Sequence, residues 1–202
     1  FDPETEAFEH YYDDKFSVLR HDGDILLTKS GDIWLMGSEG LFKVDKRNKS
    51  LIFYGSPDIK ADISLDGREL YQDSYGNIWV GYNRGLAVFN TETLSFEVID
   101  IPGVVLDVTA LKEYPKDILV IGTAGTGLVL YSISKRQVVN NFNYSPSDPK
   151  GISGSSVYSL YVDKANNLWI GLFYGLNRIN PQSQRFPLLQ NICSSQFSLQ
   201  TV

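Results

Sequence analysis

Apolar and polar residues alternate in short runs along most of the chain, and turns rich in Gly, Asn, Asp and Ser separate the runs. The clearest set occupies residues 69–73, 77–82, 85–90 and 95–100. Alternation with a period of two, carried by β-branched and aromatic residues, predicts short antiparallel strands. No segment sustains the period of about 3.6 residues that is typical of an amphipathic helix. The pattern therefore predicts an all-β protein.

These runs recur as a repeat of about 45 residues. In three copies a tryptophan is followed six residues later by a Gly-Leu pair, and a fourth copy has Val120 in place of the tryptophan. The four tryptophan positions, 34, 79, 120 and 169, are separated by 45, 41 and 49 residues. We predict that the recurring residues form the structural core of each repeat; they are Trp34, Trp79, Trp169, Gly81, Gly122, Gly171, Gly40, Gly85, Gly127 and Gly175.

Four-stranded units of this length match the blades of a β-propeller, in which each blade covers the apolar face of its neighbour. Both ends of the chain fall in mid-repeat, so we predict about four blades plus partial blades at both ends, as a fragment of a larger ring. The predicted segments are the end of a preceding blade at 1–15, blades at 16–56, 57–101, 102–144 and 145–192, and the first strand of a following blade at 193–202.

Composition and charge exclude several classes of protein. The 202 residues are 43% hydrophobic and 21% charged, which suits a packed core rather than a disordered chain. A net charge of −6 without a cluster of basic residues argues against nucleic acid as a partner. The apolar runs are too short for a membrane helix, so we expect no direct membrane insertion by this segment. Cys193 is the single cysteine, which rules out a disulfide within the chain and a cysteine-based zinc site.

The repeat cores resemble a known family. The segment from Asp73 to Gly81 reads D-x-x-G-N-I-W-V-G and is followed by Gly-Leu, and the segment from Asp163 to Gly171 reads D-x-x-N-N-L-W-I-G with the same continuation. Both are similar to the two-component regulator propeller repeat, D-x-x-G-N-[LI]-W-[IV]-G-T followed by G-L. Met36, Val120 and Asn166 depart from that pattern at the second glycine, the tryptophan and the turn glycine.

The resemblance implies a sensory role. Repeats of this family form the extracytoplasmic, periplasmic region of receptors anchored in the inner membrane, often hybrid histidine kinases, in which propellers precede a β-sandwich. Many members are associated with sensing oligosaccharides. The resemblance therefore implies a noncatalytic segment with an oligosaccharide-type ligand, with the remaining blades and the β-sandwich of the parent chain as partners, and with a homodimeric parent receptor.

Two motifs allow a structural and a functional interpretation. The three tryptophans have the aromatic faces on which a sugar ring stacks, but their common place in the repeat favours packing between blades. The turns that begin at Asp73 and Asp163 are rich in Asp and Asn, yet they lack the alternating carboxylates and the distal Glu of a calcium loop. Turn formation explains them better, and we predict neither a metal site nor a cofactor.

Candidate ligand-binding residues come from the hairpin tips between the second and third strands of each unit. In a propeller these tips emerge on one face, where ligands approach the central opening. Tyr82, Arg84, Phe173 and Tyr174 offer stacking faces and hydrogen-bond donors on turns where a purely structural role would favour small polar residues. Packing between blades or domains is the alternative for these side chains. The long turn-rich segment 143–151 is a further candidate for partner contacts.

Three functions remain open on the sequence. A sensory propeller would bind a saccharide or mediate receptor contacts and bias a membrane-bound histidine kinase. A propeller-fold carbohydrate hydrolase or lyase would need paired carboxylates or a nucleophile with its base, and we predict no catalytic residue because no such pairing is visible. A pure interaction scaffold would do neither. The absence of a His or Arg cluster favours binding over catalysis.

Overall fold

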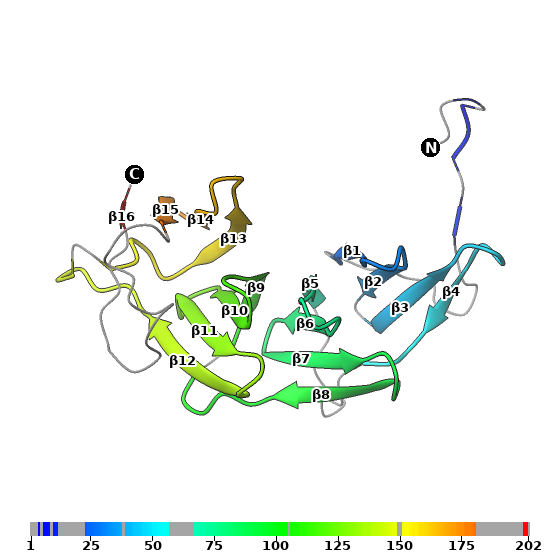
Figure 1. Cartoon of the computed structure of the whole chain (residues 1–202), viewed down its shortest axis with the longest axis horizontal. Helices are drawn as coiled ribbons and strands as arrows, with labels where there is room; N and C mark the ends of the chain where they lie inside the picture. Colours follow the sequence, from blue (N-terminus) through cyan, green and yellow to red (C-terminus); the bar gives the residue numbers. More distant parts are fainter. Residues whose placement is uncertain are drawn as a thin grey trace.

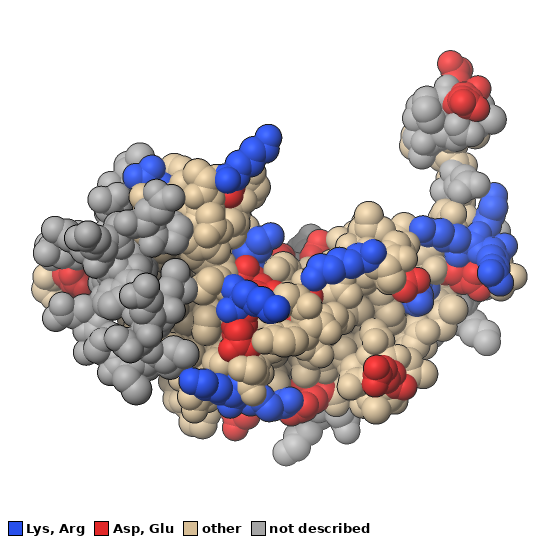
Figure 2. Space-filling model, viewed as in Figure 1, with Lys and Arg blue, Asp and Glu red and all other residues tan. Residues whose placement is uncertain are grey.

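The chain folds into four antiparallel β-sheets that follow one another along an open arc (Figure 1 and Figure 2). This computed structural model describes residues 4, 6–8, 10–11, 23–37, 39–56, 67–104, 106–148, 151–180 and 200–201. Cys193, His21 and most of the predicted partial units at 1–15 and 193–202 lie outside the described residues. Within the described part every regular element is a strand, and no helix there is long and apolar enough to cross a membrane. The predicted all-β propeller fold is confirmed.

Each sheet contains four strands. The first sheet consists of β1 (Ile25–Leu27), β2 (Ile33–Gly37), β3 (Gly40–Asp45) and β4 (Ser50–Phe53). The second consists of β5 (Gly67–Gln72), β6 (Ile78–Tyr82), β7 (Gly85–Asn90) and β8 (Ser95–Ile99). The third consists of β9 (Val108–Glu113), β10 (Ile118–Thr123), β11 (Leu128–Ser132) and β12 (Gln137–Phe142). The fourth consists of β13 (Val157–Val162), β14 (Leu168–Leu172), β15 (Gly175–Ile179) and β16 (Gln200–Thr201).

Strand order within each sheet follows the sequence, and the first strand of each sheet lies on the concave side of the arc (Figure 1). The four runs of residues 69–73, 77–82, 85–90 and 95–100 correspond to β5 to β8. The fourth sheet differs from the prediction, which put residues 193–202 in the first strand of a following blade. Instead β16 pairs with β15 as the outer strand of the same sheet, and it occupies an edge that would otherwise have unpaired backbone groups.

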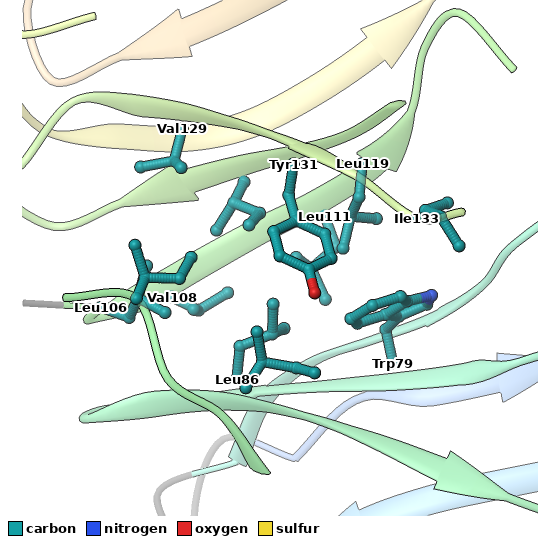
Figure 3. Packing of buried hydrophobic residues seen from close by; sticks show 12 residues of the cluster. Trp79, Leu86, Leu106, Val108, Leu111, Leu119, Val129, Tyr131 and Ile133 are labelled. Carbon is teal, nitrogen blue, oxygen red and sulfur yellow. The ribbon is translucent and has the colours of Figure 1, made fainter. Parts of the chain in front are cut away.

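Contacts between consecutive sheets form the apolar core. Trp79 of β6 packs against Tyr131 of β11 with ring centroids 5.9 Å apart and a nearly perpendicular orientation (Figure 3). Trp34 of β2 contacts Phe89 of β7 in the same way, with centroids 5.5 Å apart. Trp34 and Trp79 are buried, whereas Trp169 is half-buried on a sheet that no later described sheet covers.

The third unit has Val120 in place of the tryptophan, and the residue that faces this position on the fourth sheet differs as well. Strand registers place Val120 where the other units have tryptophan, and they place Ile179 where the preceding interfaces have Phe89 and Tyr131. Both aliphatic side chains belong to the core between the third and fourth sheets. An aromatic pair in two interfaces is thus replaced by an aliphatic pair in the third, which keeps complementary sizes across the contact.

Glycines two residues after the tryptophan position leave room for the next sheet. A Cβ on Gly81 would lie 2.4 Å from Cγ1 of Val108, and a Cβ on Gly122 would lie 2.6 Å from Cγ1 of Val157. The first interface reverses these sizes: Met36 stands at the glycine position, and Gly67 of β5 stands where β9 and β13 begin with valine. Met36 itself is buried in the core between the first two sheets.

The recurring aspartate of the motif fixes the turn and the tryptophan together. Asp73 Oδ1 accepts hydrogen bonds from the backbone N–H groups of Tyr75 and Asn77, each at 2.9 Å. Its Oδ2 accepts from Asn77 Nδ2 at 2.7 Å and from Trp79 Nε1 at 2.8 Å. Asp163 makes the equivalent bonds to Asn167 and Trp169. These bonds agree with turn formation as the role of both segments.

Candidate functional site

The hairpin tips between second and third strands share a face with the connections between sheets. The tip at Ala124 and Gly125 receives the connection to the fourth sheet, because Gly125 N–H donates to the Ser155 carbonyl at 3.0 Å and Ala124 forms a bridge with Ser156. The tip of the fourth sheet is tied to the same connection, since Phe173 N–H donates to the Ser156 carbonyl at 3.2 Å. The third and fourth sheets are therefore locked together on this face.

An exposed aromatic cluster lies on this face of the fourth sheet. Tyr158 and Phe173 have ring centroids 6.0 Å apart, and Phe173 and Tyr174 have centroids 4.4 Å apart with perpendicular planes. The side chains are 54%, 62% and 86% exposed, respectively. Three adjoining aromatic rings at such exposure form an apolar patch, on a sheet that no later described sheet covers. We call these three residues the aromatic cluster.

A β-bulge directs Tyr158 into the aromatic cluster. Val157 pairs with Leu172 and Ser159 pairs with Gly171, so Tyr158 is the extra residue between two consecutive pairs. A bulge re-aims its side chain and is often found beside functional sites. Val157 is fully buried, and its carbonyl accepts a hydrogen bond from the Thr109 hydroxyl of β9. The backbone that carries the exposed ring of Tyr158 is therefore bonded both to β14 and to β9.

The four predicted ligand-binding residues are not brought together. Phe173 and Tyr174 belong to the aromatic cluster, whereas Arg84 is exposed on the second sheet with the third sheet in between. Tyr82 is not on the surface, because only 3% of it is exposed and it belongs to the core between the first two sheets. Its hydroxyl folds back over Gly85, where a Cβ would lie 2.3 Å from the oxygen.

Tyr158 is not among the ligand-binding residues predicted from the sequence. Its run, Ser155 to Tyr161, was predicted as an ordinary first strand, in which alternate side chains face the neighbouring sheets. The bulge breaks that alternation locally, so that Tyr158 and Ser159 are both exposed although they are neighbours in the chain. Bulges sit at the same place in β5 and β9, where Gly67 and Glu69, and Val108 and Ala110, flank the extra residue. A repeated irregularity of this kind leaves no distinct signal in one sequence.

The concave side of the arc carries one perturbed carboxyl. Burial, reinforced by the negative charge of Asp24, raises the pKa of Glu69 to about 7, although Lys112 and the backbone N–H of Leu111 act in the opposite direction. Asp24 itself accepts a hydrogen bond from Leu70 N–H at 2.8 Å. Among the described residues no group of His, Cys, Asp and Glu side chains could hold a metal ion.

The aromatic cluster offers binding rather than acid–base chemistry. Its two phenols and one phenyl ring present flat apolar faces with hydroxyl groups at their edges. Such surfaces match the alternating C–H faces and hydroxyl rims of pyranose rings. Glu69 is the described carboxyl whose pKa is raised to near neutrality, and it lies on the second sheet rather than beside the cluster on the fourth.

Comparison with known proteins assigns the chain to the β-propellers. The four-sheet arc is a β-propeller segment, and residues 151–174 match the family model of the two component regulator propeller. The matched residues contain Tyr158, Phe173 and Tyr174. The resemblance of the repeat cores to this family is thereby confirmed at the fourth sheet. None of the curated proteins compared with the chain matches it.

Solved structures with the same fold include extracellular domains of B. thetaiotaomicron signalling systems. The extracellular domain assigned to the hybrid two component system BT4673 has a TM-score of 0.69 at 18% identity, over 76% of this chain and 20% of that one. The corresponding domain of BT3049 has a TM-score of 0.62 at 23% identity, over 77% and 20%. Virginiamycin B lyase from Staphylococcus aureus is also similar, with a TM-score of 0.60 at 12% identity over 78% and 51%. The chain thus spans about a fifth of the length of the first two structures.

Proposed function

We propose that this chain is a noncatalytic part of an extracytoplasmic sensory propeller that binds an oligosaccharide-type ligand through the aromatic cluster. The observation that carries the proposal is the group of exposed rings formed by Tyr158, Phe173 and Tyr174 on the ligand-accessible face of the fourth sheet. The match of the same segment to the regulator propeller model supports it. The similarity to extracellular domains of two component systems adds a plausible setting in the periplasm.

The rings are suited to a weak, reversible contact with sugar. Each ring buried under a pyranose removes apolar area from water, and an aromatic contact adds about 0.5–1.5 kcal/mol beyond that area. The perpendicular arrangement of Phe173 and Tyr174 presents two faces in different directions, which favours a ligand of more than one residue over a single sugar. A sensor needs this kind of moderate affinity because it must release its ligand when the concentration falls.

Direct titration tests the proposal. We expect isothermal calorimetry with a panel of neutral oligosaccharides to give saturable binding, and the variants Phe173→Ala and Tyr174→Ala to weaken it about tenfold each, which corresponds to ~1.4 kcal/mol. Tyr161→Ala is the matched control, because Tyr161 is equally exposed on β13 but lies outside the aromatic cluster. Equal affinity of all three variants would disprove a role of the cluster.

Product analysis separates the sensor from the rival enzyme. Virginiamycin B lyase shows that this fold also supports catalysis in another protein. If the chain is a binding segment, bound oligosaccharides remain intact after long incubation, as judged by chromatography. Cleavage that persists in Phe173→Ala and disappears on replacement of a carboxylate would favour a hydrolase or lyase instead.

We further propose that the parent receptor is anchored in the inner membrane, dimerises, and passes the bound state to a histidine kinase through further blades and a β-sandwich. The small share of the two similar extracellular domains that this chain covers supports further domains in the parent. Kinase output of the full-length receptor should rise with the oligosaccharide and respond less in Phe173→Ala. An unchanged response would separate the aromatic cluster from signalling.

A further inference from the structure

A second site lies on another part of the molecule, in the outer cleft between the second and third sheets. A cavity of about 280 Å³ opens there, and its lining includes Asn77, Trp79, Asn90, Glu97, Tyr131 and Arg136. It is distinct from the aromatic cluster, which belongs to the fourth sheet. Its size is close to the lower end of the range of small-molecule sites in proteins.

The cavity is larger than its counterpart in the preceding interface, where a longer side chain occupies part of the space. In the preceding interface a smaller cavity of about 140 Å³ occupies the equivalent place beneath Trp34. There the Lys43 ammonium lies 5.5 Å from the centre of the Trp34 ring. The strand registers pair Trp34 with Lys43 and Trp79 with Val88, so Val88 stands where Lys43 does. Valine cannot reach over the indole, which leaves the space open.

The lining of the cavity is apolar at its floor and polar toward its mouth. Val88, Ile133 and the buried rings of Trp79 and Tyr131 form an apolar floor. The hydroxyl of Tyr131 points from β11 toward the second sheet and makes no hydrogen bond within the described part of the chain (Figure 3). Toward solvent, amide and hydroxyl groups of the β7–β8 turn line the wall, among them Asn90 and Thr93.

One cation and one anion face each other at the mouth. Arg136 of the turn after β11 forms an ion pair with Glu97 of β8, which joins the third sheet to the second. Both side chains are more than half exposed, at 54% and 56%. An ion pair this exposed is screened by water and contributes little stability, so a bound molecule can replace it readily. A molecule that carries both charges can bind both side chains at once.

From this arrangement we propose that the cavity binds a zwitterionic α-amino acid with an apolar side chain. Its carboxylate replaces Glu97 on the planar guanidinium of Arg136, which is suited to bidentate recognition of carboxylates. Its ammonium group replaces Arg136 beside Glu97, so every charge remains paired. Its side chain enters the floor between Val88 and Ile133, beside the ring of Tyr131.

Calorimetric titration with L-phenylalanine and L-leucine tests the proposal on the full chain. We expect saturable binding of both, and at least tenfold weaker binding of N-acetyl-L-phenylalanine and L-phenylalaninamide, each of which lacks one of the two charges. Arg136→Gln should weaken binding tenfold or more, whereas Lys135→Gln, the exposed neighbour outside the cavity lining, should leave it unchanged. Val88→Lys, which introduces the side chain found in the preceding interface, should abolish it.

The outcomes distinguish this site from the aromatic cluster. Binding of L-phenylalanine that survives in Phe173→Ala but not in Val88→Lys supports the cavity. No saturable binding of either amino acid would overturn the proposal, as would binding that Val88→Lys leaves unchanged. Binding of D-glucose in preference to both amino acids would also overturn it, because a neutral polyol needs neither charge at the mouth. Circular dichroism of each variant shows whether it is folded, and Glu97→Gln provides a second test of the ion pair if Val88→Lys fails to fold.

Discussion

At the scale of single residues, the motif is a hydrogen-bonding device built around one carboxylate. Asp73 and Asp163 each hold a turn and the indole of a tryptophan six residues later. Hydrogen bonds from the Asn167 side chain and then from Trp169 lower the pKa of Asp163 to about 2. A carboxyl with a lowered pKa stabilises the fold above its ordinary pKa near 4, and this stabilisation is lost as the pH falls toward 2.

The third unit lacks both members of this pair. Tyr114 stands where the motif has aspartate and Val120 where it has tryptophan, so no indole N–H requires an acceptor. The Tyr114 hydroxyl instead donates to the Asn166 carbonyl of the fourth sheet at 2.8 Å. The substitution of both residues at once replaces hydrogen bonds within a unit by a contact between sheets.

Replacement of Asp73 by asparagine tests the device. An amide at this position directs a donor toward the N–H groups of Asn77 and Trp79, so we expect the free energy of unfolding to fall by about 2–3 kcal/mol. Urea denaturation followed by tryptophan fluorescence measures the change. Asp45→Asn is the control, because Asp45 caps an exposed turn in which asparagine is equally suitable. A loss no larger than that of the control would refute the role of Asp73.

At the scale of elements, the repeat is held together by size matching between a second strand and the first strand of the next sheet. Gly81 receives Val108 and Gly122 receives Val157, whereas the first interface has Met36 and Gly67 in the reversed sizes. Packed interiors tolerate such exchanges when the total volume is preserved. The small residue can therefore stand on either side of the contact, provided that a large residue stands opposite.

A pair of variants tests this size matching. Gly81→Ala should destabilise the protein by about 1–3 kcal/mol, because the new Cβ would lie 2.4 Å from Val108. The double variant Gly81→Ala with Val108→Gly, which has the sizes of the first interface, should recover part of that loss. Thermal unfolding of wild type and the single and double variants forms a double-mutant cycle. Strictly additive effects would show that the two positions do not interact.

At the scale of the whole molecule, stability is distributed along the arc. Sheets contact in the order of the sequence, with β2 against β5, β5 against β9 and β9 against β13. This makes the described part quasi-one-dimensional, as in other repeat proteins, where each unit depends on its neighbours. Glu69 is exceptional because groups of three sheets affect its pKa. It lies on the second sheet, near Asp24 of the first and near Lys112 and the Leu111 N–H of the third.

Glu69 predicts how stability depends on pH. Its carboxyl has a pKa of about 7 in the folded protein and an ordinary value of 4.5 when unfolded. The folded state therefore holds a proton that the unfolded state releases, so the free energy of unfolding should fall by roughly 3 kcal/mol as the pH rises from about 4.5 to 7. Chemical denaturation across this range should show the decline in wild type and a flatter profile in Glu69→Gln. Glu92→Gln, an exposed control, should retain the decline, and an identical profile for Glu69→Gln would exclude this residue as its source.

Most of the fold was predictable because its determinants are local. The alternation of residues 77–82 and 85–90 and the turn glycines determine strands and hairpins over a few residues, and the repeat then determines the architecture. The tryptophan pattern likewise indicated contacts between sheets. The pairing of β16 with β15 was not predicted, because the repeat pattern indicated that residues 193–202 begin a following blade.

The sequence by itself determined the repeat and the strands and hairpins within each unit, because these depend on neighbours in the chain. Only the tertiary structure decided which aromatic side chains are available. Tyr82 is the last residue of β6, at the place of the buried Leu172, and its ring lies over Gly85, whereas Phe173 is the first turn residue after β14 and is exposed beside Tyr158. The burial of Tyr82 depends on the space between packed sheets, and the contact of Phe173 with Tyr158 depends on a bulge in β13. Both arise only when distant segments meet.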